Sequence, residues 1–161
     1  VVLLGRPYHS DPGINHGIPQ ELSDLGYPVF SVESLPREGP LVERLFRPEV
    51  DRGVDPLDIS DLWPRCFSEN SSTKLWAARF TARHPNLIAV DISSFRCGHD
   101  APIYSVLDEL YARSGKPYFT FHEMDENRPA SSIKLRIETI DYFLKQYRES
   151  KTTCPSSCLA V

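Results

Sequence analysis

The fold is decided by residues 86–124, which read NLIAVDISSFRCGHDAPIYSVLDELYARSGKPYFTFHEM. The apolar run at 86–95 predicts a buried strand, and the aromatic-rich run at 116–124 predicts another. A helix is predicted between them, over 101–115, because Gly115 is the residue type that most often ends a helix in the left-handed conformation. A strand, a helix and a second strand in this order form a parallel βαβ unit with a right-handed crossover.

The same alternation continues towards both ends of the sequence. Strands are predicted at 1–4 (VVLL) and 27–34 (YPVFSVES), and helices are predicted over 14–25, 72–84 and 131–150. This alternation predicts an α/β fold, a three-layer, doubly wound, flavodoxin- or Rossmann-like parallel sheet of about four strands in the order 2-1-3-4. Helices are then expected on both faces of that sheet.

Two stretches do not follow this pattern. Residues 35–68 contain five prolines and no sustained hydrophobic period, and we interpret them as an irregular excursion outside the core, with a short helix at 41–46. Such excursions usually cover a site or contact a neighbouring domain. Residues 150–161 are predicted to be a disordered tail, and no function is assigned to its Cys154 and Cys158.

A single α/β domain is therefore expected over 1–149. The sequence begins on a core strand, with neither an initiator Met nor a basic leader region, which indicates a domain cut from a larger protein. The net charge of −4 provides no basic field, and no apolar run reaches the roughly 18 residues that cross a bilayer, so nucleic-acid and membrane partners are not expected. Four cysteines are too few for a disulfide scaffold, which favours a cytoplasmic location.

Ligands of doubly wound sheets bind outside the carboxyl ends of the strands. Three loops are expected to meet there: 5–17 after the first strand, 93–102 after the third and 122–129 after the fourth. With the order 2-1-3-4 the first and third strands are neighbours, which places Cys97 beside the first loop. That loop has the glycine spacing of neither a dinucleotide fingerprint nor a P-loop, and its glycines are about as well explained as turn residues.

Several polar side chains on these loops are candidates for substrate binding. Arg6 and His9 have the chemistry to bind an anion or to position a thioester carbonyl. For His122 and its neighbour Glu123, a functional and a structural role are both open. The substrate-binding candidates are Arg6, Tyr8, His9, His99 and His122.

The residues leave three roles open for Cys97. A nucleophilic thiol needs a fixed general base, and His99, two residues away, would have to fold back to act as one. A thiolate metal site usually needs several cysteines, of which Cys66 is one within the sequence. The third role is that of a small buried apolar residue. His99 and Asp100 are most simply interpreted as capping residues of the helix that follows.

Four segments together resemble the uncharacterised domain of CoA-substrate-specific enzyme activases, which are large proteins related to the 2-hydroxyacyl-CoA dehydratase and benzoyl-CoA reductase systems. These segments are GRPYHSDPGINHGIPQEL, KLWAARFTARHPNL, SSFRCGHDAPIY and SIKLRIETIDYFL. The resemblance extends over nearly the whole chain, to about residue 147. It implies a cytoplasmic multidomain protein, typical of anaerobes, in which an activase-type ATPase feeds low-potential electrons to an iron–sulfur partner.

A more distant resemblance links FRCGHD to the last domain of the dehydratase subunits, where the matching cysteine holds a 4Fe–4S cluster. It implies that Cys97 is a cluster ligand in the full-length protein, with the remaining ligands outside this chain, and that nearby cations stabilise added electron density. Arg6, His9 and His99 are the candidates for those cations. The segment around Cys66, WPRCFSEN, departs from the dehydratase pattern.

The ATPase motifs of the activases are absent from this sequence, so the domain is expected to be inactive alone, and no cofactor is expected in the isolated fragment. Its expected partners are the other domains of the same polypeptide, including the activase-type ATPase, and an acyl-CoA. An alternative function, of a different class, is a metal-free scaffold or substrate-binding module that docks onto the ATPase.

Overall fold

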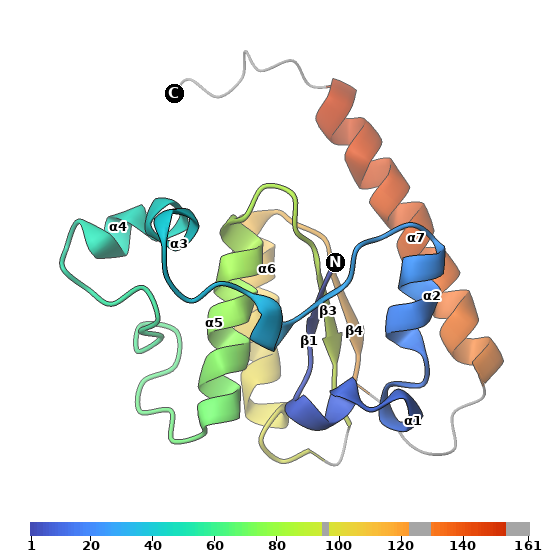
Figure 1. Cartoon of the computed structure of the whole chain (residues 1–161), viewed down its shortest axis with the longest axis horizontal. Coiled ribbons are helices and arrows are strands. Elements are labelled where there is room, and N and C mark those ends of the chain that lie inside the picture. The colour runs from blue at the N-terminus through green and yellow to red at the C-terminus, as the bar shows by residue number, and fades with distance from the viewer. Residues whose placement is uncertain (95–96, 123–129, 154–161) are drawn as a thin grey trace.

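The computed structural model describes residues 1–94, 97–122 and 130–153. These residues form three layers, with a sheet between two pairs of helices (Figure 1). No helix in this part of the chain combines the length and the apolar character needed to span a bilayer.

The sheet contains four strands, all parallel, in the order β2-β1-β3-β4. The strands are β1 (Val2–Leu4), β2 (Phe30–Ser31), β3 (Ala89–Ile92) and β4 (Tyr118–Phe121). This order confirms the predicted fold class and strand arrangement. In the register of the central pair, Leu4 lies opposite Asp91, so the loops after β1 and β3 leave the sheet side by side.

Helices cover both faces, as predicted. On one face lie α5 (Glu69–Arg83) and α6 (Tyr104–Ser114), and on the other lie α2 (Ile18–Asp24) and α7 (Ala130–Thr153) (Figure 1). Each face has its own apolar cluster, because each helix buries the stripe that it turns towards the sheet. As predicted, α6 ends at Gly115, which has a left-handed φ of 64°.

Shorter elements connect these layers. The 3-10 helix η1 (Pro7–Ser10) and the helix α1 (Pro12–Asn15) follow β1, and the 3-10 helix η3 (Ala101–Ile103) precedes α6. Two further elements, the 3-10 helix η2 (Val32–Ser34) and the helix α4 (Arg47–Val50), lie between β2 and α5.

The structure corrects the bounds of two predicted elements near the N-terminus. The helix predicted over 14–25 is split into α1 and α2, because His16 and Gly17 both have left-handed backbones, with φ of 52° and 74°. The strand predicted over 27–34 is shortened to β2, because the chain turns into η2 at Val32, whose side chain is buried.

The start of α5 also differs from the prediction. The helix is predicted over 72–84, but it begins at Glu69, and the Oγ of Ser68 accepts the N–H of Ser71 at 3.3 Å. The preceding Ser68 therefore satisfies one of the amide groups that a helix start leaves unpaired.

The interpretation of residues 35–68 as lying outside the core is wrong. The predicted short helix is present as α3 (Pro40–Leu45), but Val42, Phe46 and Ile59 are buried in the apolar cluster of α5. The Phe46 ring stacks on Trp76 with 6.3 Å between ring centroids. Residues 35–68 pack across the outer side of α5 (Figure 1). Their apolar side chains reach the core from short helices and irregular chain, which is why no sustained hydrophobic period marks them in the sequence.

The C-terminal boundary also needs a correction. The helix α7 continues to Thr153, so residues 150–153 are helical and not part of a disordered tail. The rest of that tail, 154–161, with Cys154 and Cys158, lies outside the described residues.

Candidate functional site

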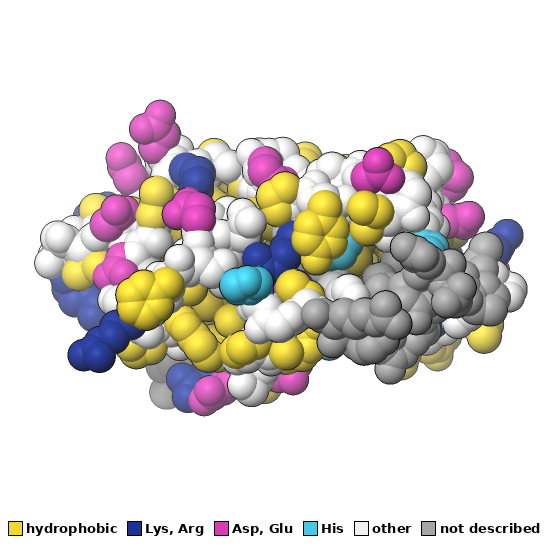
Figure 2. Space-filling view, turned by 90° about the horizontal axis from the view of Figure 1, so that it is seen from below, with side chains coloured by type: hydrophobic (Ala, Val, Ile, Leu, Met, Phe, Trp, Pro, Cys, Tyr) yellow, Lys and Arg dark blue, Asp and Glu magenta, His cyan; other side chains and the backbone are white. Residues whose placement is uncertain are grey.

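Three segments from distant parts of the sequence meet at the carboxyl ends of the strands. The guanidinium of Arg6, in the loop after β1, donates to Asp100 before η3 and, at 3.0 Å, to the Oγ of Ser71 in α5. The Ser71 hydroxyl in turn donates to the carbonyl of His99 at 3.4 Å. Seen from this end, histidine and cationic side chains lie among hydrophobic ones in the middle of the face, and acidic side chains lie mostly towards its margins (Figure 2).

Cys97 lies at the rim of this edge. Its N–H donates to the carbonyl of Ser94 at 2.9 Å, and its own carbonyl accepts the N–H groups of Asp100 and Ala101 at 3.1 and 3.2 Å. These tight turns on both sides hold the residue in place. The thiol is free and half-buried, and the residue belongs to neither apolar cluster. Its position therefore differs from that of a buried apolar residue.

Arg6 and Tyr8 lie next to the Cys97 sulfur. Burial alone would lower the pKa of Arg6, but the charge of Asp100, 2.8 Å away, the hydrogen bond to Asp100 and the interactions with Cys97 together raise it. Burial of the Tyr8 hydroxyl, with a hydrogen bond to Cys97, raises its pKa to about 12. The structure thus brings a cation and a hydroxyl donor to the thiol, in the place where the strand order positions the first loop.

His9 is close to these groups, but it is neutral. It is 6% exposed, and its Nδ1 accepts the N–H of Arg6 at 2.9 Å. Burial, followed by the charge of Lys74, lowers the pKa of His9 to about 4, so its proposed role as a cation is wrong. The close packing also explains Gly5, since a Cβ there would lie 3.1 Å from the Cβ of His9.

A buried network of charges, which the sequence analysis did not find, lies beneath Cys97. Lys74 of α5 is 1% exposed, and its Nζ lies 2.6 Å from Oδ1 of Asp91 and 3.4 Å from Oδ2 of Asp100. The Lys74–Asp91 pair is a close electrostatic contact and not a well-directed hydrogen bond. Both carboxylates are fully buried, so Lys74 and Arg6 supply the positive charges that balance them.

Asp100 stands at the N-cap position of η3, but its side chain belongs to this network. Its side chain makes no capping hydrogen bond to η3, and Oδ2 accepts the hydroxyl of Ser93 at 2.7 Å. Burial would raise the pKa of Asp100, but Lys74, Ser93 and Arg6 together lower it, so the carboxyl stays ionised. Asp100 therefore occupies the N-cap position that the sequence predicts, but its side chain pairs with the network and does not cap the helix.

The network continues from Asp91 to His122. Oδ2 of Asp91 lies 2.9 Å from Nε2 of His122 and accepts the hydroxyl of Tyr118 at 2.9 Å. The imidazole stacks on Tyr104, with 3.9 Å between ring centroids, and the Tyr104 hydroxyl donates to Ser93. Burial and the nearby charge of Asp91 raise the pKa of Tyr118, which therefore stays protonated and a donor.

A usable signal for this network was present in the sequence. Lys74 opens the segment KLWAARF, and Asp91 interrupts the apolar segment LIAVDI. A charge inside a segment that is otherwise buried needs a partner of opposite charge, since an isolated buried charge is strongly unfavourable. Applied to both segments, this rule would have paired them.

The remaining candidates are not all brought to the thiol. The side chain of His99 is exposed, next to Cys97 in the turn. Cys66 is half-buried against the apolar cluster of α5, and its Sγ donates to the carbonyl of Ser68 at 3.5 Å. Glu123 lies outside the described residues. Within those residues, no three His, Cys, Asp or Glu side chains gather into a group that could hold a metal ion.

A comparison with protein-family models bears on the loop after β1. Residues 1–35 match the CoA enzyme activase uncharacterised domain. This match confirms the resemblance for that part of the chain. It contains β1, η1 and β2, and therefore Arg6, Tyr8 and His9, whereas Cys97 lies beyond the segment that matches the activase domain. No curated protein and no solved structure matches the chain.

Proposed function

We propose that this chain is a domain of a multidomain CoA-substrate-specific enzyme activase or 2-hydroxyacyl-CoA dehydratase-like protein, in which Cys97 contributes one ligand to a 4Fe–4S cluster. When bound, such a cluster would accept and pass on low-potential electrons that an activase-type ATPase elsewhere in the polypeptide supplies. The domain is cytoplasmic and inactive by itself, and an acyl-CoA is the substrate of the complete system.

The placement of Cys97 carries this proposal. The thiol is half-buried at the rim of the edge where doubly wound sheets bind ligands, and the residue lies outside both apolar clusters. The described residues fit one ligand of a cluster and not a complete site, because Cys66 packs against the core and no metal-binding group of three occurs among them. In this proposal the other ligands come from outside this chain.

Arg6 and Tyr8 support a ligand role. The guanidinium of Arg6 lies beside the sulfur and places a positive charge next to the proposed ligand. Asp100 holds the guanidinium in place at 2.8 Å. The Tyr8 hydroxyl, which remains protonated because its pKa is raised to about 12, is a hydrogen-bond donor to the same sulfur. Hydrogen bonds to cluster sulfurs and nearby charge are what proteins use to set a reduction potential.

The test is anaerobic purification of the full-length protein as wild type and as Cys97→Ala. We expect the variant to lose most of its iron and the sulfur-to-iron absorbance, because cysteine thiolates are the groups that hold such clusters. The matched control is Cys66→Ala, which removes a thiol of similar burial that packs inward, and which should keep its iron. Unchanged iron in Cys97→Ala would contradict the proposal.

A second function is favoured by a different observation. Leu135, Tyr142 and Phe143 of α7 are 65%, 59% and 53% exposed, so this one helix presents three large apolar side chains to the surface. A metal-free scaffold or substrate-binding module that docks onto the activase ATPase would use such a surface. Unchanged iron in Cys97→Ala, together with loss of ATPase binding in Leu135→Glu, would identify this second function.

A further inference from the structure

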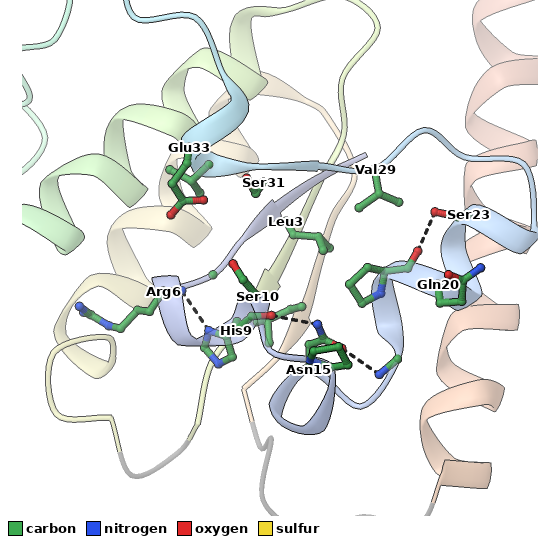
Figure 3. Close-up of a pocket in the computed structure, with 16 residues that line it drawn as sticks. Leu3, Arg6, His9, Ser10, Asn15, Gln20, Ser23, Val29, Ser31 and Glu33 are labelled. Carbon is green, nitrogen blue, oxygen red and sulfur yellow. Dashed lines mark hydrogen bonds between the residues drawn. The ribbon is translucent and has the colours of Figure 1, made fainter.

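An open cavity of about 650 Å³ lies at the carboxyl ends of β1 and β2, next to α2 (Figure 3). Its volume is within the range of about 300 to 1,000 Å³ that small-molecule sites occupy. Cys97 is not among the described residues that line it, so the cavity is distinct from the proposed cluster site. It offers a second place for a ligand at the same edge of the sheet.

The walls of the cavity are of two kinds. One part is aliphatic and is formed by the side chains of Leu3, Val29, Val32 and Ile92. The other part carries neutral hydrogen-bonding groups, which belong to Ser10, Gln20 and Ser31. Such a division suits a ligand with a flat apolar ring at one end and hydroxyl groups at the other.

Glu33 determines the charge of the cavity. It follows β2 and lies across from Ser10 (Figure 3), and no hydrogen bond or ion pair to its carboxylate is found within the described part of the chain. Arg6 also lines the cavity, but its guanidinium points out of the cavity, towards α5 (Figure 3). There the guanidinium pairs with Asp100, which precedes η3. His9 is neutral, since its pKa is lowered to about 4 by burial and by Lys74. An anionic ligand is therefore disfavoured.

In dinucleotide-binding sheets, an acidic residue just after the second strand accepts hydrogen bonds from ribose hydroxyls. Glu33 has the same place in this sheet, whereas the loop after β1 lacks the glycine spacing that binds a pyrophosphate. We infer that the cavity binds an uncharged nucleoside, with its two vicinal ribose hydroxyls donating to the carboxylate of Glu33 and its base against the aliphatic wall formed by Leu3 and Val29.

Calorimetric titration of the 161-residue chain with adenosine tests this inference. We expect saturable binding with one site per chain. Glu33→Gln and, independently, the use of 2′-deoxyadenosine should each weaken binding about tenfold or more, because each removes a hydrogen bond that involves a charged acceptor. The matched control is Glu38→Gln, an exposed residue of the same segment that does not line the cavity and should leave the affinity unchanged.

The inference is overturned if adenosine does not bind at millimolar concentration, or if Glu33→Gln binds it as tightly as the wild type does. Equal affinities for adenosine and 2′-deoxyadenosine would overturn it as well. The result is independent of the iron site, because Cys97→Ala should bind adenosine normally and Glu33→Gln should retain its iron. Failure of one proposal therefore leaves the other to be judged by its own measurement.

Discussion

At the carboxyl end of β1, the side that faces α5 is packed with buried charges, whereas the side that faces α2 opens into a cavity. On the α5 side, Lys74, Asp91 and Asp100 are almost completely buried, and each charge has a partner within 3.4 Å. On the α2 side, the carboxylate of Glu33 is exposed and has no partner among the described residues.

The two sides of this edge are therefore suited to different tasks. Buried charges hold one another in fixed positions, because separating any of them leaves an uncompensated charge in a medium of low dielectric constant. The α5 side is therefore suited to holding Arg6 next to Cys97. The α2 side has polar groups with free hydrogen-bonding capacity and room for a ligand.

Removal of the central cation tests this contrast most strongly. Lys74→Met leaves Asp91 and Asp100 buried with less positive charge, and we expect it to reduce the free energy of unfolding by roughly 3 to 5 kcal/mol. Adding Asp91→Asn to the same chain should recover part of that loss. Urea denaturation measures both. As a control, Lys145→Met removes an exposed cation that pairs with Asp141 on α7, and should cost at most about 0.5 kcal/mol.

If Lys74→Met reduced the free energy of unfolding as little as Lys145→Met does, the buried ion pairs would contribute no more to stability than the surface pair. The contrast between the α5 side, with its fixed buried charges, and the α2 side, with its open cavity, would then have no energetic basis.

The pH dependence of stability tests the neutral state of His9. Its pKa is lowered from 6.5 to about 4 in the folded protein, so below pH 6.5 the unfolded chain binds a proton that the folded chain does not. The folding stability linked to the neutral imidazole is fully present above pH 6.5. It is lost as the pH falls to about 4, which lowers the free energy of unfolding by up to about 3 kcal/mol.

We therefore expect the free energy of unfolding, measured by urea denaturation, to fall less steeply from pH 7 to pH 4 in His9→Asn than in the wild type. The side-chain oxygen of the asparagine can still accept the N–H of Arg6. His99→Asn, at an exposed position, serves as the control and should decline as the wild type does. Parallel curves for His9→Asn and the wild type would contradict a buried neutral imidazole.

The smallest expected effect concerns the outer part of the network. Tyr104→Phe removes the hydroxyl that donates to Ser93 at 2.7 Å, while Ser93 still donates to Asp100. The loss of one hydrogen bond of this kind should reduce the free energy of unfolding by about 1 kcal/mol. A reduction of several kcal/mol, measured by urea denaturation, would mean that the network is as sensitive at its periphery as at Lys74.

Much of this edge follows from local sequence patterns. The spacing of the apolar residues and the position of Gly115 are enough to predict the βαβ unit. The rule that such crossovers are right-handed then restricts the order of the strands. The neighbouring positions of the first and third strands place Arg6 and Tyr8 near Cys97, because carboxyl ends of parallel strands lie at one edge.

Other features depend on contacts between segments that have no common period. Phe46 and Ile59 become core residues only because α5 presents Trp76 and Phe80 to them. The irregular chain around them carries no pattern from which their burial could be predicted.

By itself, the sequence determined the parallel sheet, its strand order and the edge at which Cys97 lies, because these depend on hydrophobic period and on the handedness of crossovers. Which charges are buried and balanced follows from the folded structure alone, since the pKa values of His9 and Asp100 depend on burial and on the charges of Lys74 and Arg6, which other elements bring close. The free energy of a buried charge is set by what surrounds it in space, and not by its neighbours along the chain.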